Sequence, residues 1–181
     1  LVTGVLSSKP ERARTAAATI GIAEERTHAD PIRMLESEAA RPDGAEVVAI
    51  MTPNDTHYSY AMAALERGFH VICDKPMTNT LEEAKKLHER AVSDGRVFCL
   101  THNYTGYPLI RQARAMVEEG YIGDVRLVQV EYVQGGNALP FPEAPEGDLP
   151  WRHDPKKGGP SLVLGDIGTH AHNLLRFVTH L

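Results

Sequence analysis

Apolar runs alternate with amphipathic stretches along the first hundred residues of the chain. Runs of strand length occupy positions 1–6, 46–51, 69–74 and 97–101, and helical patterning fills 8–21, 31–40, 56–67 and 80–93. Nearly continuous apolar strands separated by helices are typical of a parallel sheet covered by helices on both faces. The pattern therefore predicts an α/β fold with a doubly wound, Rossmann-like sheet.

Several helix boundaries are marked by capping and terminating residues. The sequences Ser8-Lys9-Pro10-Glu11 and Thr80-Leu81-Glu82-Glu83 have the spacing of a capping box. A third helix is expected to start at Asp30-Pro31, and Gly21 and Gly68 are expected to end two of the helices.

The alternation of short apolar strands with helices ends at about residue 103. A helix is predicted at 108–118, a longer strand at Val125–Val133, a loop rich in Gly and Pro at 135–160, and a final helix at 166–181. We place the domain boundary near 103–106, with one domain at 1–104 and the start of an α+β domain at 105–181. The strand carries apolar residues on both faces, so we expect a homodimer or homotetramer.

Composition narrows the class of protein. The 181 residues carry a net charge of −5 and no basic stripe, which argues against nucleic-acid binding. No apolar run approaches the roughly 18 residues of a membrane span. Cys73 and Cys99 lie in predicted strands, where buried free thiols and a cytoplasmic location are expected and a cross-strand disulfide is the alternative.

Polar residues follow three of the predicted strands. Ligands of open parallel sheets bind beyond the carboxyl ends of the strands, so these residues form a candidate cofactor site. Lys75 is a possible charged donor aimed by Pro76, although a lysine at a strand end can also be a solvated surface residue. The site comprises Ser7, Ser8, Lys9, Arg12, Thr52, Pro53, Asn54, His57, Asp74 and Lys75.

A second candidate lies in the final predicted helix, in the sequence DIGTHAHN from 166 to 173. Asp166 and His170 are four residues apart and share a helix face, the arrangement of a tunable acid/base pair. The structural alternative is a helix-start acid beside a partly buried histidine. His172 would point away from His170 on a helix, whereas on a strand the two would share a face, which leaves a zinc hydrolase as a further alternative.

Together these motifs resemble the glucose–fructose oxidoreductase, inositol dehydrogenase and MocA (Gfo/Idh/MocA) family. The Glu-Lys-Pro signature of the family corresponds to Asp74-Lys75-Pro76, and its Thr-Pro-Asn-x-x-His stretch to 52–57. The Asp-x-x-x-His signature falls on Asp166 and His170, and WRHDP at 151–155 resembles the preceding loop. The resemblance covers essentially the whole chain.

The resemblance implies an NAD(P)-dependent oxidoreductase that transfers a hydride between a nicotinamide and a sugar or polyol hydroxyl, without a metal. Lys75, Asp166 and His170 would be catalytic and would contact substrate. Tyr104, Trp151 and Arg152 would also contact substrate, and Asn103 would lie at the cofactor. Tyr104 and Thr105 stand where the family often has arginines. The alternative is a non-catalytic nucleotide sensor on the same fold.

The nucleotide site departs from the family pattern in one respect. A Gly-x-Gly-x-x-Gly turn is not found, and Leu1 corresponds to the second strand of the family. We therefore interpret the chain as a piece of a longer protein, lacking the first strand, and expect these 181 residues alone to bind nucleotide poorly. Ser7, Ser8, Lys9 and Arg12 favour NADP over NAD, although hydroxyls can also serve a plain ribose.

Overall fold

The computed structural model describes residues 4–135 and 150–181, which form two compact units. The first unit comprises the described parts of Leu1–Thr52, Thr56–Cys73 and Thr80–Cys99. The second comprises those of Pro53–Asp55, Asp74–Asn79 and Leu100–Leu181.

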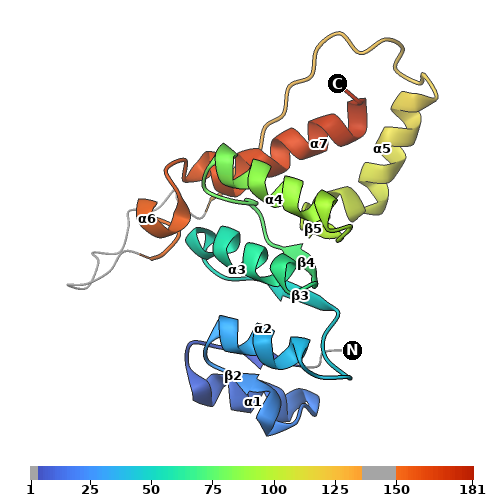
Figure 1. Cartoon of the computed structure of the whole chain (residues 1–181). Coiled ribbons are helices and arrows are strands. Elements are labelled where there is room, and N and C mark those ends of the chain that lie inside the picture. Colours follow the sequence, from blue (N-terminus) through green and yellow to red (C-terminus); the bar gives the residue numbers. More distant parts are fainter. Residues whose placement is uncertain (1–3, 136–149) are drawn as a thin grey trace. The chain divides into compact units, whose positions relative to one another are not determined.

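The first unit begins with a two-stranded parallel sheet and two helices. The strands are β1 (Val5–Leu6) and β2 (Thr27–His28), paired Val5 with Thr27 and Leu6 with His28. The helices α1 (Pro10–Ile20) and α2 (Pro31–Ala39) pack beside these strands (Figure 1), and the 3-10 turn η1 (Glu24–Arg26) precedes β2. The sequence pattern missed β2 because two polar residues provide no apolar run.

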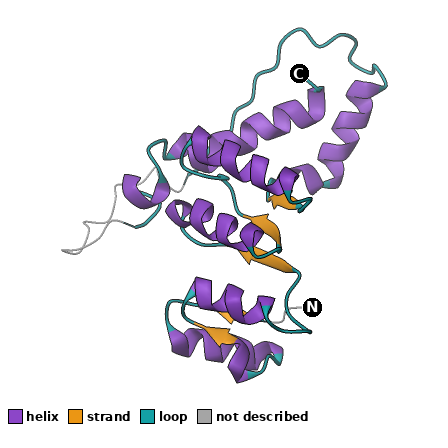
Figure 2. Cartoon of the chain, viewed as in Figure 1, coloured by secondary structure: helices purple, strands orange, loops and turns teal. Residues whose placement is uncertain are grey.

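A second parallel sheet has the strand order β3-β4-β5. Its strands are among those drawn in orange in Figure 2. Its strands are β3 (Val47–Ile50), β4 (His70–Cys73) and β5 (Phe98–Leu100), joined by helices α3 (Asn54–Glu66) and α4 (Leu81–Ser93). β3 and β4 pair from Val47 with His70 to Ile50 with Cys73. The alternation of helices with parallel strands confirms the predicted α/β class.

The strands are buried on one face only among the described residues, contrary to the expectation for a doubly covered sheet. Ile50, Val71 and Cys73 are buried, whereas Val47 and Ile72 are exposed. Helices α3 and α4 supply much of the core, with Ala61, Ala64, Leu65 and Leu87 nearly inaccessible. Both cysteines are free, but Cys99 is exposed, so the expectation of two buried thiols was wrong for that residue.

A buried ion pair joins η1 to α2. Arg26 Nε donates to Glu38 Oε1 at 3.0 Å, and a second guanidinium nitrogen meets Oε2. The Ala45 amide also donates to Glu38 at 3.0 Å. Burial alone would raise the pKa of Glu38, but the Arg26 and Ala45 contacts outweigh it and lower that pKa.

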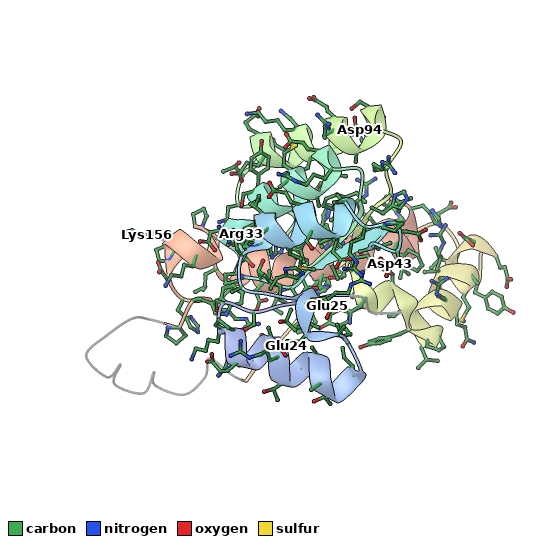
Figure 3. All side chains as sticks on the ribbon, turned by 60° about the horizontal axis from the view of Figure 1, so that its bottom comes forward. Glu24, Glu25, Arg33, Asp43, Asp94 and Lys156 are labelled. Atoms are coloured by element: carbon green, nitrogen blue, oxygen red, sulfur yellow. The ribbon has the colours of Figure 1, made fainter. Side chains whose placement is uncertain are left out.

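Two of the three predicted helix starts have the expected side-chain cap. Thr80 accepts from the Glu83 amide at 3.3 Å and Asp30 from the Arg33 amide at 2.8 Å, which confirms both N-caps. The capping box predicted at Ser8 was wrong: Lys9 is the N-cap of α1, without a side-chain cap, and Ser7 Oγ accepts the Lys9 amide at 3.2 Å. Asp94, labelled in Figure 3, follows the last turn of α4 and accepts from Arg90 at 2.6 Å.

The second unit is largely helical. It contains the 3-10 turn η2 (Asn103–Gly106), helices α5 (Pro108–Glu118), α6 (Pro155–Gly158) and α7 (Thr169–Thr179), and the π-helical turn η3 (Leu164–Gly168). α5 and α7 pack together, with the Arg114 guanidinium 4.7 Å from the Phe177 ring centroid.

The strand predicted at Val125–Val133 does not form. The segment has no assigned secondary structure, and Leu127 and Val133 are 86% and 90% exposed. An alternating pattern becomes a strand only when another strand accepts its backbone hydrogen bonds, and none pairs with it in the part of the chain that the structure describes. Most of the predicted 135–160 loop lies outside the described residues.

Candidate active site

Lys75 and Asp166 form an ion pair in the second unit. Lys75 is the second residue after β4, and its Nζ contacts the Asp166 carboxylate and donates to the Asp166 backbone carbonyl at 2.7 Å. The two side chains are 18% and 45% exposed, respectively. Lys75 is therefore paired with Asp166 and is not a solvated surface lysine. Pro76 follows it through a cis peptide bond.

The turn that carries Asp166 is π-helical, whereas the sequence predicted a regular helix from that residue. η3 spans Leu164–Gly168 and α7 begins only at Thr169. A π-turn widens the backbone by one residue and is frequent at functional sites. Here it brings both the carbonyl and the carboxylate of Asp166 to Lys75.

His170, in the first turn of α7, is buried among aromatic rings. The Tyr104 ring centroid lies 4.3 Å from that of His170, and the His102 centroid lies 5.6 Å away on an edge-on ring. Burial lowers the pKa of His170, Lys75 and His102 lower it further, and Asp166 opposes them. The imidazole is thus biased toward the neutral form that can accept a proton.

Tyr104 connects this site to the extended segment that follows α5. Its hydroxyl lies 2.8 Å from that of Tyr132, and this hydrogen bond, together with burial, raises the pKa of Tyr104. The phenol therefore remains protonated and serves as a neutral hydrogen-bonding group. Asn103, one residue earlier, is exposed, and its side chain makes no hydrogen bond within the described residues.

The loop before η3 contacts Asn54 of the same unit. Asn54 Nδ2 donates to the Gly158 carbonyl at 2.8 Å. A Cβ added to Gly158 would lie 2.7 Å from the Arg152 carbonyl oxygen, so this close approach requires glycine. The Arg152 guanidinium lies 4.4 Å from the Trp151 ring centroid. Trp151 and Arg152 thus pair with each other, and their contact with substrate stays a prediction.

Asp74 and the turn at Thr52 are each held by a hydrogen bond from a neighbouring side chain. Thr101 Oγ1 donates to Asp74 Oδ1 at 2.8 Å, within the second unit. In the first unit, His57 is completely buried, with Nε2 2.9 Å from the Thr52 carbonyl oxygen. His57 therefore supports the turn after β3 from inside, and Pro53 follows that turn.

The residues after β1 form a separate part of the candidate site, in the first unit. Ser8, Lys9 and Arg12 are exposed, and their side chains make no hydrogen bond or ion pair among the described residues. Glu11 was expected to turn back toward Ser8, but no such cap forms, so this carboxylate shares the first turn of α1 with the two cations.

An open pocket of about 510 Å³ lies beside His102 in the second unit. It is lined by His102, Thr169, His172, Asn173, Arg176 and Phe177. The sequence interpretation missed His102, although its position two residues after β5 is the same signal that drew attention to Lys75, two residues after β4.

The described residues contain neither a metal-binding cluster nor a membrane-spanning helix. Across residues 4–135 and 150–181, no three His, Cys, Asp or Glu side chains gather in a way that could hold a metal ion. No helix within those ranges has the length and apolar character to cross a membrane.

Comparison with known proteins identifies the family. Residues 1–104 match the model described as "Oxidoreductase family, NAD-binding Rossmann fold", and residues 110–180 match the GFO/IDH/MocA C-terminal domain. The chain belongs to the Gfo/Idh/MocA oxidoreductase family, as its motifs predicted.

Named relatives and solved structures agree with this assignment. The chain is 38% identical over 178 residues to the uncharacterized oxidoreductase YfiI of Bacillus subtilis, covering 98% of this chain and 45% of that protein. Identity to levoglucosan dehydrogenase of Pseudarthrobacter phenanthrenivorans is 36%, over 73% of this chain and 32% of that protein. An inositol dehydrogenase homolog of Azotobacter vinelandii complexed with NAD+ superposes with a TM-score of 0.89 at 41% identity, covering 98% of this chain and 46% of that one. The chain therefore spans less than half the length of these proteins.

Proposed function

We propose that the complete protein is an NAD(P)-dependent dehydrogenase acting on a sugar or polyol hydroxyl. The observation that carries the proposal is the Lys75–Asp166 ion pair beside a buried histidine whose pKa is lowered. Relatives named scyllo-inositol 2-dehydrogenase, levoglucosan dehydrogenase and D-xylose 1-dehydrogenase support the substrate class. In this proposal residues 1–104 belong to the nucleotide-binding domain and 105–181 to the substrate domain.

In the proposed oxidation, His170 accepts the hydroxyl proton while the carbinol carbon loses a hydride and its C–O bond becomes C=O. The bound nicotinamide supplies the hydride acceptor. Lys75 donates a hydrogen bond to the reacting oxygen and stabilises its developing negative charge. Asp166 balances the lysine and the imidazolium formed when His170 takes the proton.

The chain's own residues fit a dinucleotide at the strand ends. After β1, two exposed cations and two hydroxyls stand at the start of α1, where the positive end of the helix dipole also favours phosphate. We propose Ser7, Ser8, Lys9 and Arg12 as contacts to the adenosine ribose, with NADP preferred. Thr52, Pro53, Asn54, Asp74 and Asn103 are the proposed contacts nearer the nicotinamide, and His57 supports the Thr52 turn.

The test uses the full-length protein, a panel of cyclic polyols and sugars, and nicotinamide absorbance. Lys75→Met and His170→Ala should each lower kcat by about 10²–10⁴-fold, the usual contribution of a positioned acid, base or charge. Nucleotide affinity should change little. Matched controls are Lys86→Met and His88→Ala, both on the exposed surface of α4.

Near-normal turnover in both active-site variants would contradict the assigned roles. If nucleotide binds but no member of the panel reduces or oxidises it, the proposed substrate class is wrong.

A further inference from the structure

Two imidazoles in the second unit, the buried His170 and the half-buried His102, each have a buried nitrogen without a hydrogen bond. These atoms are His170 Nδ1 and His102 Nε2, for which no partner exists among the described residues. Buried polar atoms are nearly always paired, so each exception calls for an explanation. The two rings are neighbours, with centroids 5.6 Å apart and planes at 80°.

His102 is anchored by its backbone in a defined place. Its amide donates to the Leu100 carbonyl at 2.8 Å, and its own carbonyl accepts from Thr105 Oγ1 at 2.9 Å. Tyr104 contacts the His170 ring at a centroid distance of 4.3 Å. The imidazole of His170 thus has both Tyr104 and His102 as ring neighbours, and a turn of either histidine ring alone changes which nitrogens face each other.

We propose that His102 is a positioning residue, whose Nε2 accepts a hydrogen bond from His170 Nδ1–H and thereby leaves His170 Nε2 unprotonated as the base for the substrate hydroxyl. With the ring centroids 5.6 Å apart, the two nitrogens come to about 3.3 Å when they point at each other, which is within hydrogen-bonding reach once the rings turn from the orientations seen here. In a neutral imidazole one nitrogen donates and the other accepts, and the partner of one fixes the role of the other. One bond would therefore satisfy both buried nitrogens. This inference rests on the proposed function.

The charged and titratable groups around the pair are compatible with two neutral rings. Lys75 and Asp166 face His170, Tyr104 covers it, and His172 acts on His102 from α7. Burial lowers the pKa of His102, as do Lys75 and His172. A neutral His102 can accept from His170 both before and after His170 takes a proton, so the orientation persists through the reaction.

The first test is ¹⁵N NMR of the histidines in the full-length protein, with the His170 signals assigned through His170→Gln. The expected wild-type result is a proton on Nδ1 and a bare Nε2. In His102→Phe, which keeps a ring but removes the acceptor, the proton should redistribute between the two nitrogens. Glutamine carries an amide oxygen that reaches about as far as Nε2, so His102→Gln should retain the wild-type tautomer.

Kinetics provide the second test. His102→Phe should lower kcat by about two- to five-fold with KM nearly unchanged, because only the fraction of His170 in the reactive tautomer accepts the proton. His102→Gln should recover most of this loss, and His88→Phe on exposed α4 is the matched control.

A proton on His170 Nε2 in the wild type would overturn the proposal, and so would an unchanged His170 spectrum in His102→Phe. The NMR result needs no turnover. A protein with the expected tautomer that oxidises no sugar or polyol would therefore refute the proposed function and leave the His102–His170 interaction standing.

Discussion

At the scale of single residues, the candidate site depends on how charge and burial compete at His170. Burial and the nearby Lys75 favour neutral imidazole, and Asp166 favours the imidazolium. Both forms are needed in turn, because the base must be neutral to accept a proton and the product must be stabilised once charged. The ion pair between Lys75 and Asp166 keeps these two influences at fixed positions around the ring.

The pH dependence of oxidation follows from this balance. Since the pKa of His170 is lowered from its usual 6.5, the neutral base exists above the lowered pKa and is lost as pH falls through it. We expect the acid limb of kcat/KM for oxidation to lie below pH 6.5. Asp166→Asn should move that limb to still lower pH, because the group that raises the pKa is gone.

Steady-state rates between pH 4.5 and 9 in the full-length protein measure this profile, with His88→Ala as the control variant. An acid limb above 6.5 would show that the surroundings of His170 do not favour the neutral ring in the working enzyme.

At the scale of elements, α2 is tied to η1 by the buried pair of Glu38 and Arg26. Replacing Glu38 by leucine leaves the buried guanidinium facing only Asp43, whose side chain is 62% exposed. Loss of one partner of a buried pair costs about 3–5 kcal/mol. Glu38→Leu should therefore lower the free energy of unfolding by that amount. Glu36→Leu, on the same helix but in an exposed pair with Arg67, should cost less than about 1 kcal/mol.

Urea unfolding of the full-length variants tests this difference and its pH dependence. Because the pKa of Glu38 is lowered on folding from 4.5, its stabilisation is present above that pH and is lost as pH falls through the lowered value. Equal losses for the two variants at pH 7 would contradict the assigned role of the buried pair.

The start of α1 carries the prediction about nucleotide choice. An acid at this strand end accepts hydrogen bonds from the ribose hydroxyls and repels a 2′-phosphate, whereas Ser7 with Lys9 and Arg12 nearby favours the phosphate. We expect the full-length wild type to prefer NADP and Ser7→Asp to shift the ratio of kcat/KM toward NAD. A charge-assisted contact of about 1.5–3 kcal/mol implies a shift of roughly ten- to a hundred-fold.

Thr19→Asp places the same charge near the far end of α1 and should leave the ratio unchanged. A wild-type preference for NAD that Ser7→Asp does not alter would show that this strand end does not select the nucleotide.

At the scale of the whole molecule, the segment from Val125 to Val133 supports the proposal of self-association. It presents exposed apolar side chains, including Leu127 and Val133, which are available to pack against a second subunit. We expect light scattering of the full-length protein at micromolar concentration to give the mass of two or four chains. Leu127→Asp combined with Val133→Asp should reduce that mass, while Leu81→Asp, at an exposed apolar residue of α4, should not. A single-chain mass for the wild type would contradict the proposal.

The sequence alone determined the features that depend on local chemistry. Near-continuous apolar runs determined β3, β4 and β5. The same pattern did not predict β2, because its two residues are polar. Thr80 and Asp30 predicted their helix starts because an N-cap bonds to an amide only three residues away. The motifs at 74–76 and 166–170 identified the family because the chemistry restricts which residues serve at those positions.

Only the tertiary structure decided what depends on partners distant in the chain. It replaced the expected start of the last helix by a π-turn, so that Asp166 meets Lys75 across 91 positions of sequence. It brought His102 against His170, and no periodicity reports such a contact. It left 125–133 unpaired and one face of β3 and β4 uncovered, because a pattern specifies which side chains seek burial, whereas the available neighbours determine whether they are buried.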